Sequence, residues 1–137
     1  MNRKNKSLCL LVAALLLCAY IPLTALATDF VPMASPVFVT KTAGLNTQMK
    51  AVMACTTSVI CDKICVSGVT LQKQSGSSWA HVKSLPCPST SATNASSFGA
   101  SMDYSSHCTK GTTYRIIITY NADGVTASAT SGASTYK

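Results

Sequence analysis

The stretch that decides the fold is Gly111-Thr-Thr-Tyr-Arg-Ile-Ile-Ile-Thr-Tyr120. Tyr114, Ile116 and Ile118 alternate with polar or β-branched residues, which is the period of two expected of a strand with one buried face. The next residues, Asn-Ala-Asp-Gly at 121–124, favour a hairpin turn because an Asp-Gly pair tolerates positive φ angles. The pattern therefore predicts a central strand over 111–120 that the rest of the chain covers.

Six other segments have strand patterns, at 36–42, 45–55, 64–74, 79–85, 98–104 and 125–129. Turn or loop residues separate them, at 43–44, 56–62, 75–77 and 89–97. The apolar phase changes by one residue at Gly68, which predicts a β-bulge. About seven short strands without a helical pattern predict an all-β fold, a small antiparallel β-sandwich of immunoglobulin-like or fibronectin-like layout. A barrel is the alternative.

The amino terminus has the three parts of a secretory signal peptide. Three basic residues within 1–6 precede an apolar run over 8–23, and Ala25-Leu-Ala27 supplies small residues for cleavage. A retained membrane anchor is the weaker alternative, because Pro22 interrupts the run just before the cleavage pattern. We therefore expect a signal peptide at 1–27, an extended lead-in at 28–36 and one domain at 37–137. The protein is expected to be secreted and extracellular, with no transmembrane segment after cleavage.

The basic excess is modest once the signal peptide is removed. Three of the eleven basic residues lie within 1–27, so eight remain against four aspartates. Only one of the eight is arginine, and they are scattered along the chain, which is unlike a nucleic-acid footprint. A general attraction to anionic cell walls or membranes is what this charge supports.

Five cysteines remain after signal cleavage, and an exported chain lies in an oxidising compartment. The expectation is a fold stabilised by two disulfides with one cysteine left over, which is either buried or able to form a disulfide-linked dimer. Fifteen pairings stay open. The candidates are Cys55, Cys61, Cys65, Cys87 and Cys108. Cys61 and Cys65 also have a zinc-like spacing, but no second half of a zinc pattern follows, so no metal is predicted.

No catalytic constellation is evident, and we expect neither enzymatic activity nor a cofactor. The mature chain has four aspartates, no glutamate and two histidines, and it has no Gly-x-Ser-x-Gly elbow. His107 precedes Cys108, but neighbouring residues of a strand point to opposite faces, so adjacency does not make a catalytic pair. Trp79 and His81 are the candidates for a binding surface, with core packing as the alternative for the tryptophan.

Two separated motifs resemble a family of small secreted proteins of unknown function from Gram-positive bacteria. The first is Thr-Leu-Gln followed by Gly-Ser-x-Trp-x-x-Val, and the second is Gly-x-x-Tyr-Arg before an apolar strand. The matching residues are Thr70, Leu71, Gln72, Gly76, Ser77, Trp79, Val82, Gly111, Tyr114 and Arg115. This chain departs from the pattern in its extra cysteines, an inserted residue near Gly68 and Leu85-Pro-Cys87. The resemblance implies export and a β-rich fold, and it supplies no catalytic residues.

Together these features predict a non-catalytic protein that acts by binding or adhesion at or near the bacterial cell surface. A cell-wall glycan or a surface protein is the expected partner, and nucleic acid is not. The alternative is a secreted basic effector or antimicrobial protein, which the small size, positive charge and cysteines favour.

Overall fold

The structure, a computed structural model, describes residues 34–137, so the predicted signal peptide and most of the lead-in lie outside the described residues. The predicted all-β antiparallel class is confirmed, and this part of the chain contains one 3₁₀ turn but no α-helix. The strands are β1 (Phe38–Leu45), β2 (Lys50–Ser75), β3 (Ser78–Leu85), β4 (Ser91–Asp103), β5 (Thr113–Ala122), β6 (Val125–Thr130) and β7 (Ser134–Thr135), with the 3₁₀ turn η1 at Ser105–His107.

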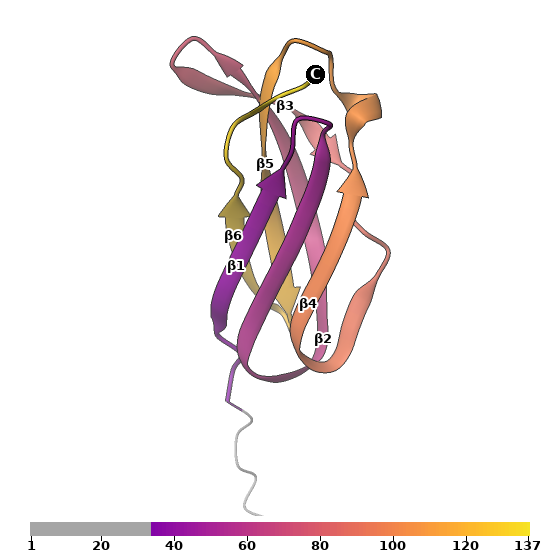
Figure 1. Ribbon diagram of the computed structural model, residues 1–137. Helices are drawn as coiled ribbons and strands as arrows, with labels where there is room; N and C mark the ends of the chain where they lie inside the picture. The colour runs from indigo at the N-terminus through magenta and orange to yellow at the C-terminus, as the bar shows by residue number, and fades with distance from the viewer. Residues whose placement is uncertain (1–33) are drawn as a thin grey trace, which may run out of the picture. The chain divides into compact units, whose positions relative to one another are not determined.

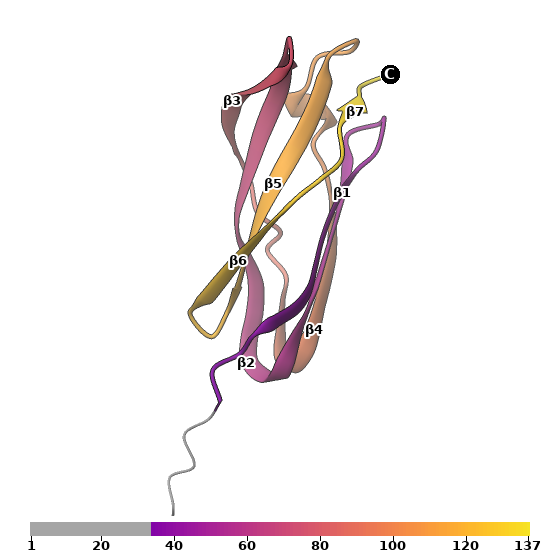
Figure 2. The same cartoon turned by 90° about the vertical axis from the view of Figure 1, so that its left-hand side faces the viewer.

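All seven strands belong to one antiparallel sheet that curls on itself (Figure 1). The path is β1-β2-β5-β6, with β3 and β4 also paired to β2 and β7 paired to β5. The first part of β2 pairs with β1 and β4, and its second part pairs with β3 and β5. Figure 2 shows the two halves of the sheet facing each other, with β1 and β4 on one side and β3, β5 and β6 on the other.

The hub of the sheet is β2, and the prediction that the stretch 111–120 is the central strand is wrong. Two segments predicted as separate strands, 45–55 from residue 50 onward and all of 64–74, belong to the 26-residue strand β2. In the predicted loop between them, Thr56 and Cys61 pair with β4, and the register shifts between these two residues where β2 bends from one half to the other. The residues of this bend resemble a loop in sequence, which is why the sequence pattern divided the strand.

Two other predicted irregular segments are also strand. The predicted turn at 43–44 lies inside β1, because the chain reverses later, at 46–49. In this reversal the side chain of Asn46 accepts hydrogen bonds from the backbone N–H groups of Gln48 and Lys50, both at 2.9 Å. Most of the predicted loop at 89–97 is the start of β4. Its Ser, Thr and Asn residues are mostly exposed, and β2 supplies their backbone partners. Small polar residues form a strand when tertiary pairing provides the ladder.

Several local predictions are confirmed. The β2–β5 register shifts between Val66 and Gly68, as the phase change at that glycine predicted. Asp123 and Gly124 have φ angles of 49° and 89° and turn β5 into β6. Gly76, with φ of 61°, forms the tight turn between β2 and β3.

The core lies between the two halves of the sheet and takes side chains from both. Its largest fully buried members are Tyr104, Tyr120, Met49, Met53, Ile64, Leu71, Ile116 and Ile118. Two tyrosine hydroxyls join elements across it: Tyr120 of β5 donates to the backbone carbonyl of Thr42 in β1, and Tyr104 donates to that of Pro86 at 2.8 Å. Because alternate residues fill this core, the residues between them form two outer faces, and one of these carries the candidate site.

Candidate functional site

The candidate site lies on the outer face formed by β3, the second part of β2 and β5. Trp79 pairs with Gln74, and Gln72 pairs with both His81 and Arg115. Directly opposed residues of antiparallel strands point to the same face, so these side chains share one surface. The two sequence-predicted binding residues, Trp79 and His81, are therefore brought together on one face of the protein.

A stack of Trp79 and Arg115 forms the centre of this surface. The guanidinium carbon of Arg115 lies 4.4 Å from the centroid of the Trp79 ring, within the range of a cation–π interaction. The Arg115 Nε also donates a 2.7 Å hydrogen bond to Oε1 of Gln72. Both large side chains are half-buried. These contacts hold the indole and the guanidinium in fixed positions before any ligand arrives.

The terminal nitrogens of Arg115 remain available to a ligand. Within residues 34–137 the side chain hydrogen-bonds only through Nε, to a neutral amide, and no carboxylate neutralises its charge. A guanidinium presents its terminal N–H groups in a planar fork that matches a carboxylate or a phosphate. His81, exposed in the row formed with Gln72 and Arg115, supplies a further polar group on the same face. We define Gln72, Trp79, His81 and Arg115 as the Trp79–Arg115 face.

Sequence reasoning named Trp79 and His81 but not Gln72 or Arg115 as part of this surface. The available signal was alternation, since Gln72 follows the buried Leu71, and Arg115 lies between two buried residues of β5. What was missing was the register, because only the pairing of β2 with β5 shows that these two residues are opposite one another.

A shallow hollow of about 250 Å³ lies on the other half of the sheet, lined by Lys50, Ser101, Met102 and Asp103. Hydrogen bonds from the side chain and backbone of Ser105 lower the pKa of Asp103. A carboxylate with a lowered pKa stays ionised at neutral pH and is a poor general acid. Asp103 is therefore unsuited to act as a general acid in this hollow.

The other ionisable residues lie outside the Trp79–Arg115 face, and some of them are occupied by hydrogen bonds within the protein. The carboxylate of Asp123 accepts backbone hydrogen bonds from Asp62 and Lys63, both at 2.9 Å, so it serves as a latch on the bend of β2. The ring of His107 lies 6.3 Å from that of Tyr104, centroid to centroid. Lys83 is a charged neighbour of Cys108, and it opposes the rise in the pKa of this thiol that burial causes.

The five cysteines within residues 34–137 are free thiols in the structure. Cys55 and Cys61 are buried, and Cys65, Cys87 and Cys108 are partly exposed. Across residues 34–137 no three histidine, cysteine, aspartate or glutamate side chains gather into a group that could hold a metal ion. Nor does this part of the chain contain a helix of the length and apolarity needed to cross a membrane.

Comparison of the chain with protein-family models, with curated proteins and with solved structures finds no match.

Proposed function

We propose that this protein is an exported, non-catalytic domain that binds an anionic glycan at the bacterial cell surface through the Trp79–Arg115 face. The observation that carries the proposal is the stack itself, in which an arginine with free terminal nitrogens is fixed against the only tryptophan of the chain.

The chemistry of the two side chains matches that of an acidic sugar. An indole ring packs on the apolar C–H face of a sugar ring, and it has an N–H for a hydroxyl. A guanidinium binds a carboxylate or phosphate through two parallel hydrogen bonds. Because the face has one cation and no acid, it attracts a polyanion and disfavours a cationic partner.

Tryptophan fluorescence tests this proposal directly, because the only tryptophan of the chain lies in the site. Titration with soluble acidic polysaccharide from bacterial walls should shift the emission of Trp79 until the site is saturated. Arg115→Ala should weaken binding by about tenfold or more, which corresponds to the roughly 1.5–3 kcal/mol of a hydrogen bond to a charged group.

The matched control is Lys50→Gln, which removes one positive charge from the opposite half of the sheet. It should leave the affinity within about twofold of wild type. Equal losses from Arg115→Ala and Lys50→Gln would show that net charge alone drives binding and would rule out the Trp79–Arg115 face as the site.

A secreted basic effector or antimicrobial protein is the second candidate function. The observation that favours it is that all seven lysines within residues 34–137 are exposed. Such a protein would release dye from vesicles of anionic lipid, and salt would abolish the release, since exposed charges are screened. Retention on wall material at moderate salt, without dye release, would favour glycan binding.

We also infer that the finer architecture is an immunoglobulin-like or fibronectin-like sandwich stabilised by disulfides. Seven strands around a core between two facing halves support this layout. The hydroxyl of Tyr114 accepts a 3.0 Å hydrogen bond from the backbone N–H of Thr109, as in a tyrosine corner. A crystal structure in which β1 and β6 pair to close a barrel would contradict it.

A further inference from the structure

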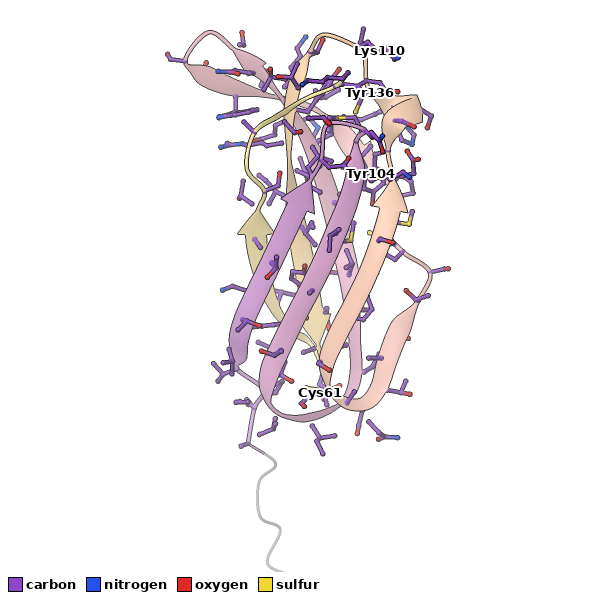
Figure 3. All side chains as sticks on the ribbon, in the orientation of Figure 1. Cys61, Tyr104, Lys110 and Tyr136 are labelled. Atoms are coloured by element: carbon purple, nitrogen blue, oxygen red, sulfur yellow. The ribbon has the colours of Figure 1, made fainter. Side chains whose placement is uncertain are left out.

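The five cysteines divide into two groups by position and burial. Cys55 and Cys61 lie on either side of the bend in β2 and are 1% and 0% exposed. The other three are partly exposed: Cys65 lies in the second half of β2, Cys87 in the connection between β3 and β4, and Cys108 directly after η1. In Figure 3, Cys61 lies near one end of the domain, by the bend, and Tyr104 lies toward the other end. Tyr104 is a neighbour of Cys87, since burial and then the charge of Cys87 raise its pKa. The two groups are therefore separate.

Cys55 and Cys61 both neighbour Thr57. Cys55 and Thr57 are alternate buried residues of β2, so their side chains are adjacent on the inner face. The Cys61 thiol lies 3.5 Å from the hydroxyl oxygen of Thr57. Burial and the charge of Cys61 together raise the pKa of Cys55 to about 11, as expected of two close thiols.

Cys65 and Cys87 lie on the same edge of β2. On that edge Leu85 pairs with Val69, and Ser91 pairs with Cys65. The connection at 86–90 therefore runs beside β2 from Val69 to Cys65, a distance of four residue steps. Those steps span about 13 Å. The register therefore places residue 87 beside the part of β2 between Cys65 and Val69. Burial and the charge of Cys65 raise the pKa of Cys87, and the backbone N–H of Val69 lowers it.

Cys108 has different neighbours from the cysteines of the two pairs. It follows η1, and its backbone N–H donates to the carbonyl of Ser105 at 3.2 Å. Lys83 is the one charged neighbour that affects its pKa, whereas Cys55 and Cys87 each respond to another thiol.

From this geometry we propose that the five cysteines pair as Cys55–Cys61 and Cys65–Cys87 in an oxidising compartment and that Cys108 is the remaining free thiol. This scheme selects one of the fifteen arrangements; it rests on the proposed export of the protein and not on the proposed glycan binding.

Each bridge forms by two thiol–disulfide exchanges with a small disulfide such as oxidised glutathione. The Cys87 thiolate attacks the oxidant, forming a mixed disulfide and releasing one thiolate. The Cys65 thiolate then attacks the sulfur of Cys87, forms the bridge and releases the second thiolate. The cysteines lose two protons and two electrons, and the oxidant becomes two thiols. The Cys55–Cys61 bridge forms by the same steps before the core closes, because the folded protein buries both sulfurs.

A tryptic map of the mature protein, which begins after the expected cleavage at Ala27 and keeps five cysteines, tests the scheme. The chain is refolded in oxidised glutathione buffer, labelled with N-ethylmaleimide and digested without reduction. Trypsin cleaves after lysine and gives peptides 51–63, 64–73 and 84–110, because no lysine or arginine lies within 84–109. We expect peptide 51–63 to carry no label and to have a mass lower by two hydrogens than that of the reduced peptide, because of its internal bridge. We expect peptide 64–73 to be joined to 84–110 by a disulfide, with a single label on Cys108.

Cys87→Ser and Cys108→Ser are the matched variants. Cys87→Ser should release peptide 64–73 with a label on Cys65, whereas Cys108→Ser should keep both bridges and lose the label. Reduction of the wild-type protein should lower its melting temperature by about 10 °C or more, because a bridge that closes a loop of about 20 residues strongly restricts the unfolded chain.

Three results would overturn the scheme: a bridge inside 84–110 that joins Cys87 to Cys108, a link from 51–63 to another peptide, or labels on all five cysteines. A bridge between Cys108 residues of two chains would support it, since both intrachain pairs remain. If Cys87→Ser fails to fold, the wild-type map alone decides.

Discussion

The two outer faces of the sheet differ although the same strand, β2, contributes to both. The Trp79–Arg115 face combines an aromatic ring, a guanidinium, an amide and an imidazole. The outer face of β1, the first part of β2 and β4 is made almost wholly of small residues, and register places nine of them together: Thr40, Thr42, Gly44, Val52, Ala54, Thr56, Ser97, Gly99 and Ser101.

The difference shows that the inner and outer residues of each strand serve separate purposes. Inward residues of both halves fill one core, so they are alike in being apolar. Outward residues are free to differ, and the long functional side chains gather on only one half. The predictions below test whether the core is shared and whether binding belongs to one face.

The largest effect is expected from Ile116→Asp, which places a charge in the core that both halves share. Ile116 is 0% exposed, and an unpaired buried carboxylate costs more than about 4 kcal/mol, enough to prevent folding. The control is Ile117→Asp on the outer face of the same strand, which should retain a cooperative thermal transition. Circular dichroism melting of both variants checks this, and a normal transition in Ile116→Asp would remove that residue from the core.

Alkaline pH should separate the two halves by ionising the tyrosines between them. Burial is the main cause that raises the pKa of Tyr104 and of Tyr120 from 10 to about 12. The folded state therefore favours the neutral phenols, and their contribution is complete below pH 10 and is lost as pH rises to 12. Each shift corresponds to a loss on the order of 2 kcal/mol.

Urea unfolding at successive pH values from 9 to 12 measures this loss. Tyr120→Phe should show a shallower decline above pH 10, because one of the two phenols is gone. In the reduced protein, the ionisation of Cys55 near pH 11 adds to the decline that remains. A free energy of unfolding that stays constant from pH 10 to 12 would contradict the assignment.

An intermediate effect is expected from Asp123→Asn at the bend of β2. Asparagine tolerates the φ of 49°, but it has one oxygen where the carboxylate uses both, so the substitution removes the charge and one of the two hydrogen bonds to the backbone. We expect a loss of about 1 kcal/mol in the free energy of unfolding, measured by urea titration at neutral pH. Unchanged stability would show that the latch does not hold the bend.

The smallest effect is expected from Thr40→Ala on the small-residue face. It removes the 2.7 Å contact between the hydroxyls of Thr40 and Thr56, which is exposed and is worth under about 1 kcal/mol. Glycan affinity should equal that of wild type, in contrast to Arg115→Ala. A matching loss of affinity in the fluorescence titration would mean that both faces take part in binding.

Local chemistry made some features predictable. The bulge at Gly68 follows from a phase change within ten residues, and the turn at Asp123-Gly124 follows from two residues that accept positive φ. The identity of the hub was not predictable, because the bend of β2 near Thr56 and Cys61 resembles a loop in sequence. Nor was the full site, since Gln72 and Arg115 are 43 positions apart and meet only through register.

The sequence by itself determined the all-β class, the inward and outward residues of most strands and several turns, because these depend on alternation and on backbone angles of neighbouring residues. Only the tertiary structure decided that one long strand, β2, serves both halves and that Gln72 of β2, Trp79 of β3 and Arg115 of β5 share one face. It also decided which thiols are neighbours. Those relations depend on pairing between distant segments, which hydrogen bonding and the shared core select together.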